Sequence, residues 1–413
     1  MSDKAKMIAA VIIVFVIAAA VAVVAPKILT RQGAPSTTTV TTTVTKTTTK
    51  TVVESATVSK VVTTTSTKTA AQATAQKQSS GVVYLKMGGA TFPAPQYLAW
   101  IKEFMKEYPN IKLSYELLGS GAGVARFLDG TLDVAGSDPP LPHDLWAKHK
   151  GSIMQVPTLV GAVVVTYNLP GIGSKTLNLS GKVLALIYLG KIVYWDDPRI
   201  QKLNPGIKLP HHEIFVVFRA DASGTQQIFT TFLHKAAPDL WPESLVGKAP
   251  AFPVKKTGRA AGGKGNPGVA QLIKSNEYSI GFVEWSYAIE NHLPIAALEN
   301  AAGNFVKPSI ESLVAAAASA AKHLPTTPLG DFSKDEDYII YASGKDSYPL
   351  VAFTHLVLWT HYSKAKAEAI ATYLKWIVNV GEKKIVPGYA PVPDSLKKLM
   401  LDAASIILKN SAG

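Results

Sequence analysis

The chain has 413 residues, of which 47% are hydrophobic and 17% charged, and it contains no cysteine. This length accommodates about two to three domains, and the hydrophobic content excludes a wholly disordered protein. The lack of cysteine excludes disulfides, thiolate metal sites, cysteine nucleophiles and a cysteine-linked lipid anchor. The net charge is +13, but residues 1–80 carry nine basic against two acidic side chains, and no basic stripe with interleaved aromatic residues follows. Nucleic acid is therefore not an expected partner.

The first predicted element is a membrane-spanning helix near the N-terminus. Met7–Ala25 is an uninterrupted apolar run of 19 residues, preceded by Lys4 and Lys6 and followed by Lys27. About 20 apolar residues suffice to cross a bilayer, whereas the apolar core of a cleaved signal peptide has about 7–15. We therefore expect residues 1–30 to form a retained anchor, with a cleaved signal peptide and a secreted protein as the alternative. The flanking lysines do not determine the orientation.

A threonine-rich tract follows the apolar run. Ser36–Thr69 contains 17 threonines among 34 residues, and Ala70–Ser80 continues the tract with Ala, Gln and Ser. A low-complexity tract without large apolar side chains buries no core, so residues 31–81 are predicted to form an extended, disordered stalk. Stalks of this composition are often O-glycosylated outside the cell, which favours an extracellular binding domain. The folded part is expected to begin near Val82.

From Val82 onward the composition is that of a globular protein. Short apolar runs such as Val163–Val165 and Ile214–Val217 alternate with amphipathic stretches such as Tyr97–Tyr108 and Ala365–Val380. Strands that alternate with helices indicate an α/β architecture with largely parallel sheets.

Four segments combine glycine or proline with small hydroxyl residues, and three of them precede an amphipathic stretch. A hydroxyl or glycine at a helix start caps the helix, and the unpaired N–H groups there also form an anion site at the positive end of the helix dipole. Capping alone explains any one such segment, but several of them, one with an arginine, favour an oxyanion site. The segments are Gly88–Pro95, Gly119–Gly123, Ala135–Asp138 and Arg219–Thr225.

Charged residues in these segments indicate which anion is bound. Arg219 with Asp221 suggests a guanidinium held by a carboxylate while it binds an anion, and the alternative is a surface ion pair worth about 0–1 kcal/mol. Asp138 would repel an anion unless that anion shares a proton, as phosphate does and fully deprotonated sulfate does not. A lone acceptor among donors therefore predicts selection of phosphate, although Asp138 alone also fits a turn ahead of Pro139.

Other patterns are weaker. Gly258–Gly265 nearly matches a nucleotide-binding P-loop, but glycine replaces the Ser/Thr that binds magnesium, so a glycine-rich surface loop is predicted. Ser223 lacks the Gly-x-Ser-x-Gly context of a hydrolase nucleophile. Asp335–Asp337 is interpreted as a solvated acidic turn, and the aromatic residues Trp285 and Tyr287 are expected in the core. No catalytic group and no metal site is predicted.

Five segments, taken in chain order, form a recognisable set: Gly-Ala-Thr-Phe-Pro-Ala-Pro (89–95), Gly-Ser-Asp (136–138), Arg-Ala-Asp-x-Ser-Gly-Thr (219–225), Gly-Gly-Lys-Gly-Asn (262–266) and Ile-Gly-Phe-Val-Glu-Trp-Ser-Tyr-Ala (280–288). Together they resemble the phosphate-binding proteins of ABC phosphate importers. The resemblance runs from about Val82 to near Pro393 in the family's own order. The combination of segments carries it, since each alone would be weak.

The resemblance implies a periplasmic-binding-protein-like α/β fold of two lobes joined by two crossing segments, preceded by the transmembrane helix and the disordered stalk. Lobe I would comprise residues 82–161 and 348–413, and lobe II residues 162–347. The anion would lie between the lobes and would need no cofactor or metal. In that site the family's pattern assigns donors to Thr91, Phe92, Ser120, Ser223, Gly224 and Thr225, the cation to Arg219 supported by Asp221, and the proton acceptor to Asp138.

Two positions depart from the family's pattern. Ala222 stands where glycine is common, which would cost about 1 kcal/mol if the backbone there needs a positive φ. Gly121-Ala122 replaces a Ser-Gly pair after Ser120 and removes one hydroxyl. The apolar run and the threonine tract lie outside the shared region, and they resemble the tether of archaeal solute-binding proteins.

The predicted function is that of an extracellular receptor, not an enzyme, that binds inorganic phosphate and delivers it to an ABC phosphate permease by lobe closure. We expect a monomer held at the cell membrane by a single N-terminal span. The alternatives are the same fold with another oxyanion, such as sulfate, tungstate or molybdate, and a secreted phosphatase that depends on Ser223.

Overall fold

The computed structural model describes residues 81–411, and the first strand begins at Val83. The predicted membrane anchor and nearly all of the predicted stalk lie outside the described residues. Among residues 81–411, no helix combines the length and the apolar character needed to cross a membrane.

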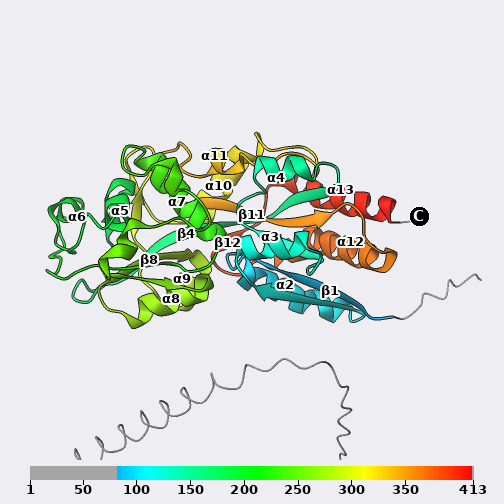
Figure 1. Ribbon diagram of the computed structural model, residues 1–413, viewed down its shortest axis with the longest axis horizontal. Helices are drawn as coiled ribbons and strands as arrows, with labels where there is room; N and C mark the ends of the chain where they lie inside the picture. The colour runs from blue at the N-terminus through cyan, green and yellow to red at the C-terminus, as the bar shows by residue number, and fades with distance from the viewer. Residues whose placement is uncertain (1–80, 412–413) are drawn as a thin grey trace, which may run out of the picture. The chain divides into compact units, whose positions relative to one another are not determined.

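A nine-stranded mixed sheet runs through this part of the chain (Figure 1). Its order is β2 (Ile111–Leu117), β1 (Val83–Gly89), β3 (Val134–Ser137), β11 (Val351–Trp359), β4 (Ile153–Asn168), β8 (Ser279–Glu284), β6 (Phe215–Arg219) and β7 (Ala260–Gly263), with β12 (Tyr389–Ala390) paired to β4. The prediction of largely parallel sheets is right for the outer strands, where β1 pairs in parallel with β2 and β3, and β6 with β7 and β8. It is wrong for the centre, where β3–β11, β11–β4 and β4–β8 are antiparallel.

The three antiparallel pairings at the centre reverse the direction of the outer strands. β6, β7 and β8 therefore run opposite to β1, β2 and β3, and the carboxyl ends of both groups point toward the middle of the molecule. In α/β sheets, ligands bind at the carboxyl ends of the strands. This arrangement brings two such edges toward each other.

The long strand β4 connects the two halves of the sheet. Its residues 153–162 pair with β11 and its residues 163–168 pair with β8. All of its residues except Asn168 are buried, in agreement with a run rich in Val and other apolar side chains, which is typical of a strand covered on both faces. The predicted apolar run Val163–Val165 lies at this junction.

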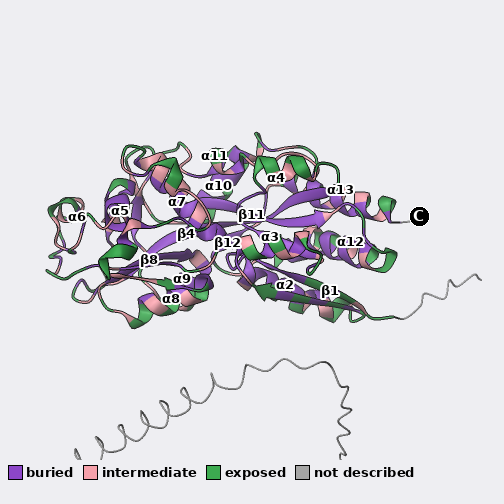
Figure 2. Cartoon of the chain, viewed as in Figure 1, coloured by how far each residue is buried: buried purple, intermediate pink, exposed green. Residues whose placement is uncertain are grey.

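Helices cover both halves of the sheet. Figure 1 shows α2, α3, α12 and α13 with the half on the right, and α5, α7, α8 and α9 with the half on the left, and Figure 2 shows that the strands between them are buried. The helices are α2 (Ala94–Glu107), α3 (Ser120–Leu128), α4 (His143–Lys148), α5 (Gly181–Tyr188), α6 (Pro198–Leu203), α7 (Gly224–Ala236), α8 (Gly265–Ser275), α9 (Trp285–Glu290), α10 (Ile310–Ala321), α11 (Asp335–Ile339), α12 (Lys364–Asn379) and α13 (Asp394–Asn410). A small sheet contains β10 (Phe305–Val306), β9 (Ala297–Glu299) and β5 (Asn178–Leu179).

The two amphipathic stretches predicted from the sequence are the helices α2 and α12. α2 buries Tyr97, Trp100 and Phe104, which recur every three to four residues on one face. The ring of Phe104 lies 5.0 Å from that of Tyr373 and 5.7 Å from that of Trp376, both on α12. These aromatic contacts hold the two helices together.

Two local predictions are wrong. Gly258–Gly265 is not a surface loop, because Ala260–Gly263 forms β7 and Gly265 begins α8. Glycine permits this close packing, since a Cβ atom on residue 263 would lie 2.4 Å from the backbone nitrogen of Val269. In the predicted acidic turn, Asp335 is only 2% exposed and its carboxylate lies 3.0 Å from the Nε2 of His355 on β11. Both errors arise from contacts with distant segments, because β7 pairs with β6 and Asp335 is buried against His355 on β11.

Candidate functional site

The predicted site residues lie where the two halves of the sheet meet. They come from the loop between β1 and α2, from the start of α3, from the end of β3, from the end of β6 and from the start of α7. All eight predicted binding residues are buried, namely Thr91, Phe92, Ser120, Asp138, Arg219, Ser223, Gly224 and Thr225.

Direct contacts join residues of the two halves at this place. A Cβ atom on residue 224 would lie 2.4 Å from Ser120 Oγ and 2.5 Å from Asp138 Oδ2. Asn266, in the first turn of α8, donates its backbone N–H to Thr91 Oγ1 at 3.0 Å. Glycine at position 224 therefore permits an approach that any side chain would prevent.

Arg219 contributes the cation of the site. Its Nε donates to Asp221 Oδ1 at 2.9 Å and its Nη2 donates to Asp221 Oδ2, so the carboxylate holds one edge of the guanidinium. Burial raises the pKa of Asp221, but the hydrogen bonds and charge of Arg219 outweigh this effect and keep the pKa below its usual value. The Arg219 side chain is 1% exposed. This pair is therefore not the surface ion pair that was the alternative interpretation of the sequence.

Asp138 is the carboxylate of the site. Its Oδ1 accepts from Thr354 Oγ1 at 3.1 Å, and its Oδ2 accepts from Ser120 Oγ at 3.2 Å. Burial raises the pKa of Asp138 to about 7, although the hydrogen bond from Thr354, the charge of Arg219 and other smaller effects lower it. Near neutral pH this carboxyl group can therefore either hold a proton or accept one.

The hydroxyl groups of Thr91 and Thr225 each keep a proton that can be donated to a bound anion. Asn266 Nδ2 donates to both oxygens at 3.1 Å. Thr91 Oγ1 also accepts the Asn266 N–H, and Thr225 Oγ1 also accepts from Arg219 Nη1 at 3.3 Å. A hydroxyl oxygen has two lone pairs and one proton, so each of these hydroxyls has used its lone pairs and retains the proton. Two such donors suit a bound anion.

Several backbone N–H groups are also available. The N–H groups of Thr91 and Phe92 take part in no hydrogen bond among residues 81–411, although the two residues are 2% and 0% exposed. Buried N–H groups are almost always paired, so these two point to a ligand. The first N–H groups of α7, on Gly224 and Thr225, have no acceptor within the helix. They lie at the positive end of its dipole.

The site does not contain the parts of a covalent catalyst. Ser223 is the N-cap of α7, and its Oγ accepts the Gln226 N–H at 3.1 Å. Among residues 81–411, no imidazole or carboxylate is hydrogen-bonded to this hydroxyl. A serine nucleophile needs a base within hydrogen-bond reach. The arrangement therefore suits non-covalent binding of an oxyanion and does not favour the phosphatase alternative.

Two residues of the site were not predicted. Asn266 organises both threonine hydroxyls, and it ends the Gly-Gly-Lys-Gly-Asn segment that also carried the family resemblance. Thr354 donates to Asp138 from within the apolar strand β11. The polar pair Thr354-His355 within an otherwise apolar run is a sequence signal that could have identified Thr354. No local pattern indicates its partner, 216 residues away.

The two departures from the family's pattern face each other. Ala222 does not have a positive φ, so the expected backbone strain is absent. A Cβ atom on residue 121 would lie 2.5 Å from Ala222 Cβ, and the Gly121 N–H donates to the Ala222 carbonyl at 3.0 Å. The methyl group of Ala222 therefore occupies the space that a serine at position 121 would need.

This contact gives a stability prediction. Gly121→Ser should lower the free energy of unfolding by about 1–3 kcal/mol, because it overpacks the contact with Ala222. Adding Ala222→Gly should recover most of that loss, and Ala222→Gly alone should change stability little. Denaturant unfolding of the three variants measures these effects. A double variant no more stable than Gly121→Ser would contradict the explanation.

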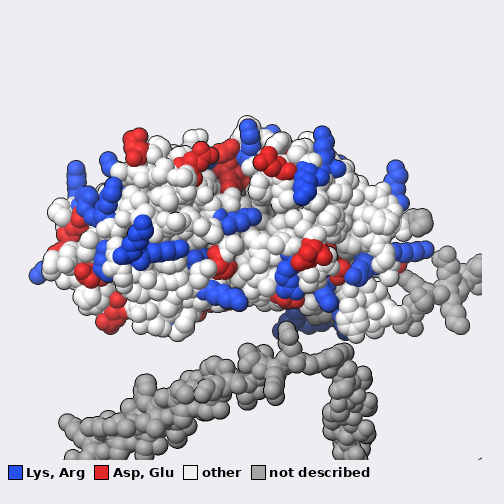
Figure 3. All heavy atoms as spheres, in the orientation of Figure 1, with Lys and Arg blue, Asp and Glu red and all other residues white. Residues whose placement is uncertain are grey.

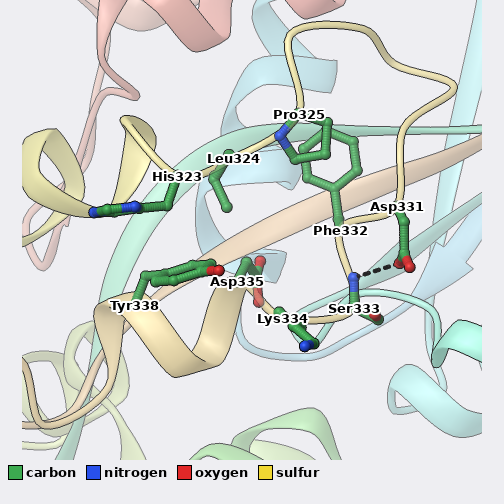
Figure 4. A pocket seen from close by; sticks show the side chains of 9 residues that line it. All are labelled: His323, Leu324, Pro325, Asp331, Phe332, Ser333, Lys334, Asp335 and Tyr338. Atoms are coloured by element: carbon green, nitrogen blue, oxygen red, sulfur yellow. Dashed lines mark hydrogen bonds between the residues drawn. The ribbon is translucent and has the colours of Figure 1, made fainter.

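A separate surface pocket of about 260 Å³ is drawn in Figure 4. It is lined by residues 323–325, 331–335 and Tyr338, and none of the predicted binding residues contributes to it. Asp335 lies at this pocket and contacts His355, whose Nδ1 lies 3.1 Å from the backbone carbonyl oxygen of Asp138. The pocket is thus connected to Asp138 through Asp335 and His355, but it is not part of the candidate site.

Comparisons with known proteins place the chain in a family. A family model described as a PBP superfamily domain matches residues 30–380. The phosphate-binding protein PstS of Methanocaldococcus jannaschii is 44% identical over 346 residues, which cover 81% of this chain and 88% of that protein. The chain belongs to the PstS family of phosphate-binding proteins. Another PstS relative, from Pasteurella multocida, is 39% identical over 311 residues, covering 75% of this chain and 86% of its own.

Solved structures agree with this family at the level of the fold. A high-affinity periplasmic phosphate-binding protein, PfluDING, matches with a TM-score of 0.60 and 21% identity, over 76% of this chain and 92% of its own. A human phosphate-binding apolipoprotein matches with a TM-score of 0.60 and 20% identity, over 78% of this chain and 98% of its own. The predicted periplasmic-binding-protein-like α/β fold is confirmed.

Proposed function

We propose that this PstS-family chain is an extracellular receptor that binds inorganic phosphate and delivers it to an ABC permease. Its relatives are named as phosphate-binding proteins. The observation that carries the proposal is the buried set of donors arranged around one carboxylate. The hydroxyls of Thr91 and Thr225, the free N–H groups and Arg219 would bind phosphate oxygens, while Asp138 would share the phosphate's proton. Phosphate would be held without any covalent step.

The eight predicted residues are proposed to form the phosphate site, in two lobes that close on the anion. Ser120 would act through Asp138, because its hydroxyl donates to Asp138 Oδ2. We retain residues 82–161 with 348–413 as lobe I and residues 162–347 as lobe II. The division is supported by β4, which changes its pairing partner between residues 162 and 163, and by β11, which begins at Val351. Closure would replace the hydration shell of phosphate by fixed donors.

The cellular setting forms part of the same proposal. A single N-terminal span in residues 1–30 and the threonine-rich stalk would hold a monomer outside the membrane, next to its permease. On the face drawn in Figure 3, basic and acidic side chains are interspersed. This pattern gives no support to a nucleic-acid partner, which would favour a continuous basic surface.

Thermal unfolding with and without anions tests the ligand class. Phosphate should raise the Tm of the full-length chain, because a ligand that binds only the folded state stabilises it by about 2.7 kcal/mol at 100 times its Kd. Sulfate at the same concentration should raise it far less. Equal shifts with sulfate, tungstate or molybdate would favour the other-oxyanion alternative and contradict selection by Asp138.

The enzymatic alternative has its own outcome. Release of phosphate from a chromogenic monoester, lost in Ser223→Ala, would support a phosphatase and overturn the receptor proposal. We expect no turnover above that of buffer.

A further inference from the structure

Three tyrosine hydroxyls bind three consecutive backbone carbonyls in the loop between β1 and α2. They come from β2, α9 and β12, and they are all buried, with exposures of 8%, 6% and 2%. Tyr115 donates to the Ala90 carbonyl at 2.8 Å, Tyr287 to the Thr91 carbonyl at 2.6 Å, and Tyr389 to the Phe92 carbonyl at 2.6 Å.

Two of these hydroxyls lie directly behind proposed anion donors. The carbonyl of one residue and the N–H of the next belong to one planar trans peptide group and point in opposite directions. The Ala90 carbonyl therefore shares its peptide group with the Thr91 N–H, and the Thr91 carbonyl shares its group with the Phe92 N–H. A hydrogen bond at the carbonyl orients the peptide plane and polarises the N–H at its other end.

The surrounding backbone makes room for the Tyr115 hydroxyl. A Cβ atom on residue 136 would lie 2.2 Å from that oxygen, so only glycine fits there. The Gly136 carbonyl also accepts the Ala90 N–H at 2.9 Å. The Ala90–Thr91 peptide group is thus held from β2, and the preceding Gly89–Ala90 peptide group is held from β3. Among residues 81–411, the Thr91 N–H has no hydrogen-bond partner.

We propose that Tyr115 and Tyr287 are positioning residues for the anion, whose hydroxyls hold two peptide groups so that the Thr91 and Phe92 N–H groups point into the site. This inference rests on the proposed function, since it concerns the donors of the phosphate site. The bond from Tyr287 also joins α9 to the β1–α2 loop, and it is made only when these two elements are in contact.

Tyr389 offers a matched control in the same loop. The Phe92 carbonyl shares its peptide group with Pro93, and proline has no N–H. Tyr389 therefore stands behind no donor, although its hydrogen bond has the same length as that of Tyr287. Its hydroxyl also lies 2.8 Å from Glu284 Oε2, so its loss should affect stability at least as much as the loss of the other two.

The test compares Tyr115→Phe, Tyr287→Phe and Tyr389→Phe in the full-length chain. By calorimetric titration, Kd for phosphate should rise about 3- to 10-fold in the first two variants and less than about 2-fold in Tyr389→Phe. Amide proton shifts in chains labelled with 15N threonine and phenylalanine give a second readout. Phosphate should move the Thr91 and Phe92 amide protons downfield, and this movement should shrink at Thr91 in Tyr115→Phe and at Phe92 in Tyr287→Phe.

A merely structural role gives a different result. In that case the loss of affinity would follow the loss of Tm in the ligand-free variants, so Tyr389→Phe would be as weak a binder as Tyr287→Phe, and the inference would be overturned. It would also be overturned if both variants bound phosphate like the wild type, or if the two amide shifts were unchanged. A wild-type chain that does not bind phosphate would overturn the proposed function, and this inference with it.

Discussion

Asp138→Asn is expected to lower the preference for phosphate over sulfate by at least about 100-fold at about pH 9, where the wild-type carboxyl group, with a pKa of about 7, is almost fully ionised. The variant replaces a buried proton acceptor, which accepts from Thr354 and Ser120, by an amide that can donate to the anion. Phosphate affinity should fall because its proton loses a partner. Sulfate affinity should rise because the unpaired negative charge facing it is removed. Calorimetric titration with each anion measures both effects.

Glu382→Gln is the matched control for Asp138→Asn. Glu382 is also a buried carboxylate, 8% exposed, but it pairs with Lys397 and lies outside the proposed site. Its variant should change stability without changing the ratio of the two affinities. If Asp138→Asn kept the wild-type ratio, the assignment of Asp138 as the selecting residue would be wrong.

The pH dependence of sulfate binding follows from the same carboxyl group. Burial raises the pKa of Asp138 to about 7, so the group is increasingly protonated, and no longer repels sulfate, as the pH falls through that value. Wild-type affinity for sulfate should rise over this range, whereas that of Asp138→Asn should stay flat. The free energy of unfolding should also increase as the pH falls, because the folded state holds the Asp138 proton more tightly than the unfolded state does. This stabilisation is complete below about pH 3.9 and is lost as the pH rises through about 7.

Arg219→Met is expected to weaken phosphate binding by about 1,000-fold or more, because a buried charged hydrogen-bond donor to the anion is lost. The same change leaves Asp221, whose side chain is only 14% exposed, without its cation. The removal of one partner of a buried pair typically costs about 3–5 kcal/mol of stability. Titration calorimetry and denaturant unfolding measure these two losses separately.

The double variant Arg219→Met/Asp221→Asn separates the two effects. The amide oxygen that Asp221→Asn introduces could still accept the Gly265 N–H, which donates to Asp221 Oδ1 at 2.9 Å in the wild type. Stability should therefore recover in the double variant, while phosphate affinity should not. Recovery of affinity with stability would show that Arg219 acts only through the fold.

Much of the site could be predicted because its residues lie in short local patterns. Ser223 precedes a helix, so its role as an N-cap and the free N–H groups of Gly224 and Thr225 follow from capping chemistry. Arg219 and Asp221 are two residues apart, so their pairing is local as well. Asn266 and Thr354 were missed, because they act on residues that are 175 and 216 positions away in the chain.

Residues without a polar partner in their own segment were the hardest to interpret. Tyr287 was correctly expected in the core, but its hydroxyl binds the Thr91 carbonyl, a contact that no local spacing indicates. Asp335 was expected in solvent because it is the first of three acidic residues, yet His355 and the surrounding chain bury it. Local composition measures polarity, whereas burial depends on which distant elements pack together.

By itself the sequence determined the α/β class, the order of the site segments and the donors that capping and charge require, since these depend on residues within a few positions of one another. Tertiary structure alone decided that the carboxyl ends of two oppositely directed groups of strands meet, that Asn266 joins two threonine hydroxyls, and that Asp138 is buried deeply enough for its pKa to reach about 7. The physical reason is that hydrogen-bond partners and desolvation are properties of a place in space, and that place is assembled here from segments far apart in the chain.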